Sequence, residues 1–170
     1  CHPFRVTSAE SLKYFQYNYR NISKSTSSLN GGILPNVREL SALYRSAHNT
    51  MRNVDGLQPQ EAFDELLKYL FFKQNHEIEG LGDEAIEIDQ VRRLFSVYLN
   101  TATSWSADVW RDKKIVLSDE CLSDIHSLLF PIQLLKINYD IRSHALKEFL
   151  TSEIRKGLGI FLTPDEVVAA

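Results

Sequence analysis

The sequence predicts an all-α protein: a multi-helix bundle preceded by a short N-terminal appendage whose structure the pattern leaves open. Beyond residue 32, apolar residues return at helical spacing in successive segments, and none of these segments sustains the apolar–polar alternation of a half-buried strand. The composition is that of an ordinary globular domain, with 170 residues, 44% hydrophobic and 24% charged. A chain of this size buries about 70% of its unfolded-chain surface. We therefore expect one core, and disorder, collagen-like repeats and low complexity are excluded.

The first 32 residues differ in character from the rest. Residues 8–20 fit either a short helix or the end of a strand, because several aromatic residues crowd this stretch. Residues 21–32 are rich in serine and end in two glycines, which is typical of a linker. We expect residues 1–32 to be a linker plus the tail of a preceding domain. The missing initial methionine, and an end at Ala170 inside an expected helix, predict a piece of a longer protein.

Prolines mark the starts of the first two expected helices. Pro35 sits where a first helical residue is favoured, and Asp55 and Gly56 end that segment. Pro59 opens the next helix, whose wide apolar stripe predicts burial on most sides. The apolar positions are Val37, Leu40, Leu43, Tyr44 and Ala47 in the first helix, and Ala62, Phe63, Leu66, Leu67, Leu70 and Phe71 in the second.

Three further amphipathic segments complete the expected bundle. The acidic stretch at 77–89 contains a loop, and residues 104–114 are interpreted as a surface connection anchored by tryptophans. Ser118 is a favourable N-cap, Pro131 kinks or ends the helix that follows, and Gly157 stops the last helix. Their apolar positions are Val91, Leu94, Phe95, Tyr98 and Leu99, then Leu122, Ile125, Leu128 and Leu129, then Ile141, Ala145, Leu146, Phe149, Leu150 and Ile154.

Charge and composition exclude several functional classes. Lysine and arginine number 19 against 22 acidic residues, a net charge of −3, so no overall basic footprint indicates nucleic acid. A DNA duplex would avoid the acidic stretch at 77–89 and tolerate the basic residues near either end. No apolar run approaches the ~20 residues of a membrane-spanning helix, and the first residues form no signal peptide. We expect no membrane contact and a cytoplasmic location.

Self-contained catalytic chemistry is not visible in the sequence. No two of the five histidines are spaced at i, i+3 or i, i+4, and no carboxylate is arranged with them in metal-ligand spacing, so we expect no metal site. Cys121 lies in the first turn of an expected helix, where the helix dipole can lower a thiol pKa. A buried structural thiol is nevertheless the better interpretation, because no partner base is identifiable. With no phosphate-binding glycine loop either, we expect no catalytic residue and no enzyme complete within this chain.

A sharp turn followed by a helix start occupies residues 157–168, with the sequence Gly-Leu-Gly-Ile-Phe-Leu-Thr-Pro-Asp-Glu-Val-Val. Two glycines permit the turn, and threonine and proline are favoured at N-cap and N1. Such a start offers free backbone N–H groups and a hydroxyl, which suit a carboxylate ligand. By itself this layout also fits an ordinary turn before an ordinary helix.

The surroundings of this segment resemble the N6-adenine DNA methylases of type I restriction-modification systems. In that family a helix of the form Asp-x-x-Gly-x-Ala-(Phe/Leu)-Glu-x-Phe-Leu runs into Gly-Gln-(Phe/Tyr)-(Phe/Tyr)-Thr-Pro-x-x-(Ile/Val)-Val. This chain has Asp-Ile-Arg-Ser-His-Ala-Leu-Lys-Glu-Phe-Leu at 140–150, followed by the segment at 157–168. Upstream, Ala-His-Asn-Thr-Met-Arg at 47–52 and the apolar helix at 61–73 are similar to the family's Ile-His-Asn-x-Leu-Arg and Leu-Leu-Phe-Leu-Lys segments.

The resemblance implies that residues 157–170 begin an S-adenosylmethionine-binding methyltransferase domain. Ile160 stands where the family has glutamine, Leu162 where it has an aromatic ring, and Ser143 replaces the common glycine. The family's glycine-rich loop and its Asn-Pro-Pro-(Tyr/Phe) segment, which holds the flipped adenine, would follow this chain. We therefore expect S-adenosylmethionine in the parent enzyme and no cofactor on this chain alone. The implied cofactor-binding residues are Ile160, Phe161, Leu162, Thr163, Pro164 and Asp165, with Thr163 near the methionine carboxylate.

By the same resemblance, residues 33–156 are the helical N-terminal domain that helps close around DNA and contacts a specificity subunit, with a restriction subunit as a further candidate partner. We hypothesise that basic residues near the catalytic junction contact DNA phosphates: Arg142, Lys147, Arg155 and Lys156. The alternative, from a different class, is a stand-alone helical adaptor that binds another protein through an exposed apolar stripe. The helix at 63–72 is apolar enough for that role.

Overall fold

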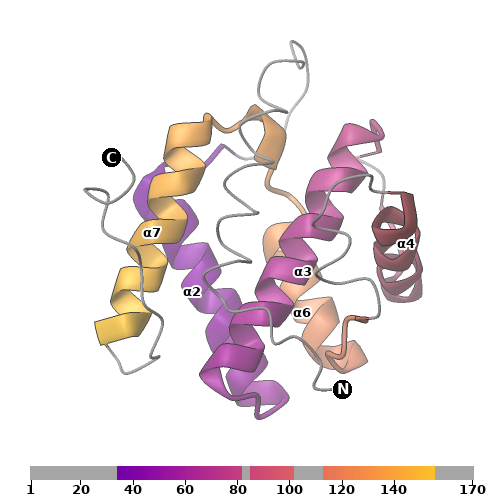
Figure 1. Ribbon diagram of the computed structural model, residues 1–170, viewed down its shortest axis with the longest axis horizontal. Helices are drawn as coiled ribbons and strands as arrows, with labels where there is room; N and C mark the ends of the chain where they lie inside the picture. Colours follow the sequence, from indigo (N-terminus) through magenta and orange to yellow (C-terminus); the bar gives the residue numbers. More distant parts are fainter. Residues whose placement is uncertain (1–33, 82–84, 102–112, 156–170) are drawn as a thin grey trace, which may run out of the picture.

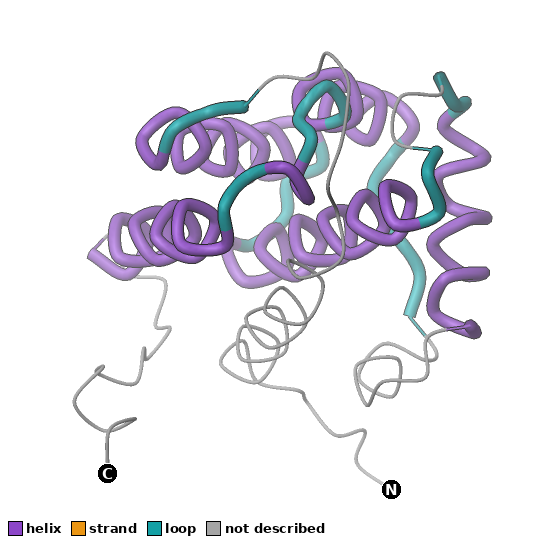
Figure 2. Tube along the Cα trace, turned by 90° about the horizontal axis from the view of Figure 1, so that it is seen from above, coloured by secondary structure: helices purple, strands orange, loops and turns teal. Residues whose placement is uncertain are grey.

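The computed structural model describes residues 34–81, 85–101 and 113–155, and within these ranges the protein is all-α (Figure 1). The described elements are α2 (Val37–Val54), α3 (Pro59–Ile78), α4 (Ile88–Thr101), α6 (Asp119–Leu129), the 3-10 turn η1 (Leu134–Lys136) and α7 (Tyr139–Arg155). Figure 2 shows only helices and loops in these ranges, which confirms the predicted fold class. The expected appendage at 1–32 and most of the tryptophan connection at 104–114 lie outside the described residues.

Helix α3 lies at the centre of the bundle. It packs against α2, α4 and η1 (Figure 1). Its apolar residues Phe63, Leu66, Leu67, Leu70 and Phe72 are at most 1% exposed, and each such side chain stabilises the fold by about 1.5–3 kcal/mol relative to an exposed one. The prediction of burial on most sides is therefore confirmed. The same burial removes the exposed apolar stripe on which the adaptor alternative depended.

Helix α2 begins after its proline rather than at it. The Oδ1 atom of Asn36 accepts the Glu39 N–H at 3.0 Å, and the Glu39 carboxylate accepts the Asn36 N–H at 2.9 Å. This reciprocal capping box satisfies two helix-end donors, so Pro35 precedes the helix and the expectation that it opens α2 is corrected. Pro59 does lie in the first turn of α3. Gly56, at φ +66°, forms the predicted break between the two helices.

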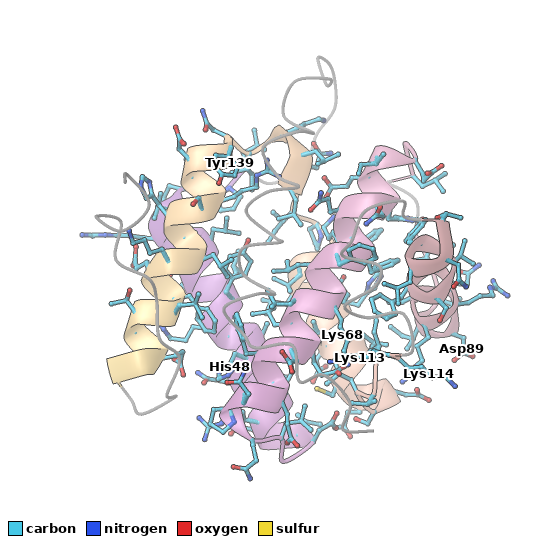
Figure 3. The ribbon with its side chains drawn as sticks, viewed as in Figure 1. His48, Lys68, Asp89, Lys113, Lys114 and Tyr139 are labelled. Carbon is cyan, nitrogen blue, oxygen red and sulfur yellow. The ribbon has the colours of Figure 1, made fainter. Side chains whose placement is uncertain are left out.

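Helices α2 and α7 pack side by side and run in the same direction. Tyr44 meets Phe149 edge-on, with ring centroids 6.5 Å apart, and one turn further along α2 His48 lies against Phe149 and Glu153. The contacting residues advance by four positions on both helices, which requires parallel axes. In Figure 3, Tyr139 at the start of α7 and His48 in the later part of α2 accordingly lie at opposite ends of this pair.

Helix α4 covers one edge of α3. It is seen nearly end-on in Figure 1 and lengthwise in Figure 2, so it runs across the direction of the other helices. Aromatic rings join the two helices: Phe71 meets Phe95 edge-on at 5.9 Å between centroids, and Phe72 stacks on Tyr98 at 6.2 Å. Such pairs add about 0.5–1.5 kcal/mol beyond the area they bury.

Charged residues inside the bundle attach η1 to α3. The Glu77 carboxylate accepts Nζ–H of Lys73 at 2.7 Å and the backbone N–H groups of Leu134 and Leu135 at 3.0 and 2.8 Å. Lys73 is 1% exposed, and its ammonium lies 4.9 Å from the ring centroid of Phe130. Because hydrogen bonds to a charged group are stronger than neutral ones, Glu77 fixes the position of η1.

A second charged pair on α3 holds the segment that leads into α6. The Glu65 carboxylate forms an ion pair with Lys68 and accepts the Val116 N–H at 3.0 Å. The Lys68 ammonium also donates to the Lys114 carbonyl at 2.8 Å. Burial raises the pKa of Glu65, an effect that the neighbouring Lys68 opposes. At the end of this segment, the Asp55 carboxylate at the end of α2 accepts the Ser118 N–H at 2.9 Å. Helices α2, α3 and α6 are thereby connected through polar contacts as well as through the core.

Candidate nucleic-acid interface

The residues that the sequence assigned to S-adenosylmethionine lie outside the described residues. These are Ile160, Phe161, Leu162, Thr163, Pro164 and Asp165, and Lys156 is outside as well. Arg155 is the last residue of α7, and its side chain is not described. The cofactor assignment and these two DNA contacts stay predictions.

Arg142 is the exception among the proposed DNA contacts, because the structure places it in the interior. Its side chain lies on α7 and is 3% exposed. Its positive charge opposes the rise in the pKa of Tyr44 that burial on α2 causes. A guanidinium buried between two packed helices does not reach a phosphate on the surface. The expectation that Arg142 contacts DNA is therefore corrected: it belongs to the packing between α2 and α7.

Lys147 is on the exposed side of α7. The other exposed residues of this helix are Asp140, His144 and Glu148. Two carboxylates therefore share the solvent face of α7 with Lys147, and this face is not a basic surface. Sequence reasoning chose α7 for its basic residues without knowing which of them face inward.

The contact between α2 and α7 contains a histidine and a glutamate that are sealed from solvent. His48 Nε2 donates to the Pro59 carbonyl at 2.9 Å, and its Nδ1 lies 3.7 Å from the Glu153 carboxylate. The two side chains are 0% and 1% exposed. A substrate cannot reach this pair in the packed bundle, so its chemical role is to fix α7 against α2 and the start of α3.

Two further histidines are paired with tyrosines: His76 is buried and His126 is half-buried. The Tyr69 hydroxyl lies 2.9 Å from Nδ1 of His126, and the Tyr98 hydroxyl lies 3.0 Å from Nδ1 of His76. Burial, with a smaller contribution from Lys73, lowers the pKa of His126 to about 4, so its ring is neutral at pH 7. No cluster of three or more histidines, cysteines or carboxylates suited to a metal occurs in the described part of the chain.

Cys121 is a buried thiol, as its sequence context favoured. It is 0% exposed in the first turn of α6, and burial together with the Asp55 carboxylate raises its pKa to about 12. The helix dipole does not overcome these two effects. Cys121 is therefore a thiol rather than a nucleophilic thiolate near neutral pH.

Helix α2 also carries basic residues, to which the sequence alone assigns no role. Arg38 and Arg52 are exposed and Arg45 is half-buried. Their common spacing of seven residues is visible in the sequence and places them along one side of a helix. Recognising that side as the solvent side requires knowing where α7 and α3 pack.

Comparison with known proteins adds nothing to the fold class that the structure shows. No protein-family model, no curated protein and no solved structure matches the chain. Across the described ranges, no helix has both the length and the apolar character needed to cross a bilayer.

Proposed function

We propose that this chain is the helical N-terminal domain of a site-specific N6-adenine DNA methyltransferase of a type I-like restriction-modification system. Its role is to help hold DNA beside the catalytic domain and to contact a specificity subunit. The observation that carries the proposal is the Thr-Pro sequence at 163–164, preceded by the sequence pattern at 140–150. The structure is compatible with it, because residues 140–150 belong to one continuous helix, α7.

In this proposal the chain assists methyl transfer by positioning DNA and cofactor, and the catalytic residues belong to the domain that follows. The methyl group comes from S-adenosylmethionine in the parent enzyme, and Thr163 is the residue of this chain expected to contact its carboxylate. Among the basic residues chosen from the sequence, the proposal keeps Lys147, Arg155 and Lys156 as phosphate contacts and drops Arg142. Partner subunits and a cytoplasmic location follow from the resemblance alone.

The gene downstream of Ala170 provides the first test. A glycine-rich loop after a strand, followed by Asn-Pro-Pro-Tyr or Asn-Pro-Pro-Phe, is expected, and a stop codon directly after Ala170 would overturn the proposal. The complete gene product is then assayed for transfer of labelled methyl groups to adenine in duplex DNA. Replacing Thr163 with alanine should raise the KM for S-adenosylmethionine about 10- to 100-fold, because a hydrogen bond to a charged group is worth about 1.5–3 kcal/mol. Thr101→Ala, at an exposed position ending α4, is the matched control.

A further inference from the structure

Helix α2 carries a row of arginines on its solvent side. Arg38, Arg45 and Arg52 follow one another at intervals of seven residues, which is close to two helical turns, so they line up along the helix. At a rise of about 1.5 Å per residue, neighbouring arginines are about 10 Å apart and the row is about 21 Å long. We call these three residues the arginine row.

In the described part of the chain, no carboxylate neutralises the positive charge of the arginine row through an ion pair. Lys68, Lys73 and Arg92 each form an ion pair, whereas none of the three arginines does so with a described residue. The carboxylate nearest in sequence, that of Glu39, is engaged in the N-terminal cap. The other exposed residues on α2 after that cap are uncharged: Ala42, Ser46, Asn49, Asn53 and Val54.

The positive charge of α2 contrasts with the rest of the protein. Helix α2 has three arginines and one glutamate, while α6 has three carboxylates and no lysine or arginine. The whole chain has a net charge of −3. The average charge therefore conceals a surface that attracts anions, bordered by surfaces that repel them.

The arginine row borders the contact between α2 and α7. Ser41 and His48 are buried and lie three or four positions from the arginines on either side of them, so they form the neighbouring row on the helix surface. His48 faces Glu153 of α7. Because α2 and α7 run in the same direction, Arg52 lies toward the end of the bundle at which α7 ends. From that end the chain continues into the segment that resembles the cofactor motif.

We propose that the arginine row of α2 is a docking surface for the phosphate backbone of duplex DNA. Guanidinium groups suit phosphates because they donate several hydrogen bonds in a fixed plane. A row about 21 Å long covers the axial length of about six base pairs, over which a duplex presents about twelve phosphates, since each base pair rises by about 3.4 Å. Serine and asparagine, which share this face, also donate to phosphate oxygens. The choice of DNA as the anion rests on the proposed function.

The test is the salt dependence of DNA binding by the full chain. A fluorescein-labelled duplex of arbitrary sequence is titrated by anisotropy between about 50 and 200 mM KCl. Each phosphate contact contributes about −0.9 to the slope of log K against log salt. The triple variant Arg38→Gln/Arg45→Gln/Arg52→Gln should therefore flatten the slope by about 2.7. Between about 50 and 200 mM KCl, the factor by which the binding constant decreases should be about 40 times smaller for the variant than for the wild type.

A matched control removes the same charge elsewhere. Arg93, Lys113 and Lys114 are exposed, and none belongs to α2 (Figure 3 labels the two lysines). The variant Arg93→Gln/Lys113→Gln/Lys114→Gln should keep a slope within about 0.9 of the wild type. Circular dichroism establishes that both variants remain helical, which is expected because the substituted side chains are exposed or half-buried.

Four outcomes would overturn the proposal. Three are no DNA binding at the lowest salt, an unchanged slope in the arginine-row variant, and equal flattening in the control. A fourth is binding of polyglutamate as tightly as DNA, with the same loss in the arginine-row variant, which would make an acidic protein the occupant. The measurement uses neither S-adenosylmethionine nor methyl transfer. The two proposals can therefore fail separately. The protein can be a methylase whose arginine row does not bind DNA, and the arginine row can bind DNA even if no methylase domain follows it.

Discussion

Replacing Glu77 with alanine should remove a large part of the stability of the bundle. The change leaves the Lys73 ammonium, 1% exposed, without this carboxylate, and leaves the N–H groups of Leu134 and Leu135 without their acceptor. Breaking a buried ion pair by removing one partner costs about 3–5 kcal/mol, and a buried amide left without a hydrogen bond costs about 1–3 kcal/mol. These costs overlap, because η1 can shift and admit water. We expect a net loss of about 4 kcal/mol, against a total of about 5–15 kcal/mol for a typical domain.

The measurement is urea denaturation followed by circular dichroism, with the m-value checked for equality between variants. Glu79→Ala is the control, because Glu79 is exposed just after the end of α3 and should change stability by less than about 0.5 kcal/mol. The double variant Lys73→Met/Glu77→Gln should recover part of the loss, since no buried charge is then left without its opposite. If Glu77→Ala and Glu79→Ala unfold within about 1 kcal/mol of each other, Glu77 does not hold η1 as argued.

Smaller perturbations test other parts of the bundle. Gly56→Ala puts a side chain at φ +66° in open space, so backbone strain alone should cost about 1 kcal/mol, seen as a lower urea midpoint; an unchanged midpoint would contradict the assigned conformation. Because burial lowers the pKa of His126 to about 4, the unfolded chain binds a proton there that the folded chain does not. This contribution should make stability fall as pH drops from about 6.5 toward 4, and the fall should be shallower in His126→Asn thermal scans. With Cys1 replaced by serine, the native thiol of Cys121 should react with a disulfide reagent at about pH 8 far more slowly than in urea, and rapid native labelling would argue against its burial. Ser118→Ala should cost about 1 kcal/mol by removing the N-cap of α6, whereas Ser118→Thr should retain most of that stability in the same assay.

The helices could be predicted from the sequence, because the spacing of apolar residues indicates the face that each helix buries. The stripe on α3 predicted burial on most sides, and Gly56 predicted the break between α2 and α3 correctly. The start of α2 was placed too early. Pro35 is a common first residue, but the exchange of hydrogen bonds between Asn36 and Glu39 determines the boundary.

The buried charges could not be predicted, because their partners are remote in sequence. Glu65 and Glu77 lie on α3, whose wide apolar stripe predicts burial on most sides but does not say where its charged residues find partners. Their acceptor roles depend on backbone N–H groups more than 50 residues away, at Val116 and Leu134. Charged residues are buried only when such partners are present, and sequence periodicity contains no information about them.

The position of the proposed interface could not be predicted from the sequence. Arg142 looked like a surface cation because local sequence does not say which side of α7 meets α2, and the structure buries it. The spacing of the arginine row was readable, yet a seven-residue interval fits a buried face as well as an exposed one. Only the packing of Tyr44 and His48 against α7 identifies the exposed side.

The parallel contact between α2 and α7 also has a consequence for synthesis of the chain. The surface of α2 that receives Phe149 and Glu153 is made early, while these two residues follow it by about a hundred positions. At about 5–20 residues per second, α2 waits about 5–20 seconds for its neighbour to be translated. During that interval Tyr44 and His48 lack the cover that α7 provides, so α3 and α6 are the first elements available to shield the rest of the α2 core face. The bundle is therefore expected to close last at α7.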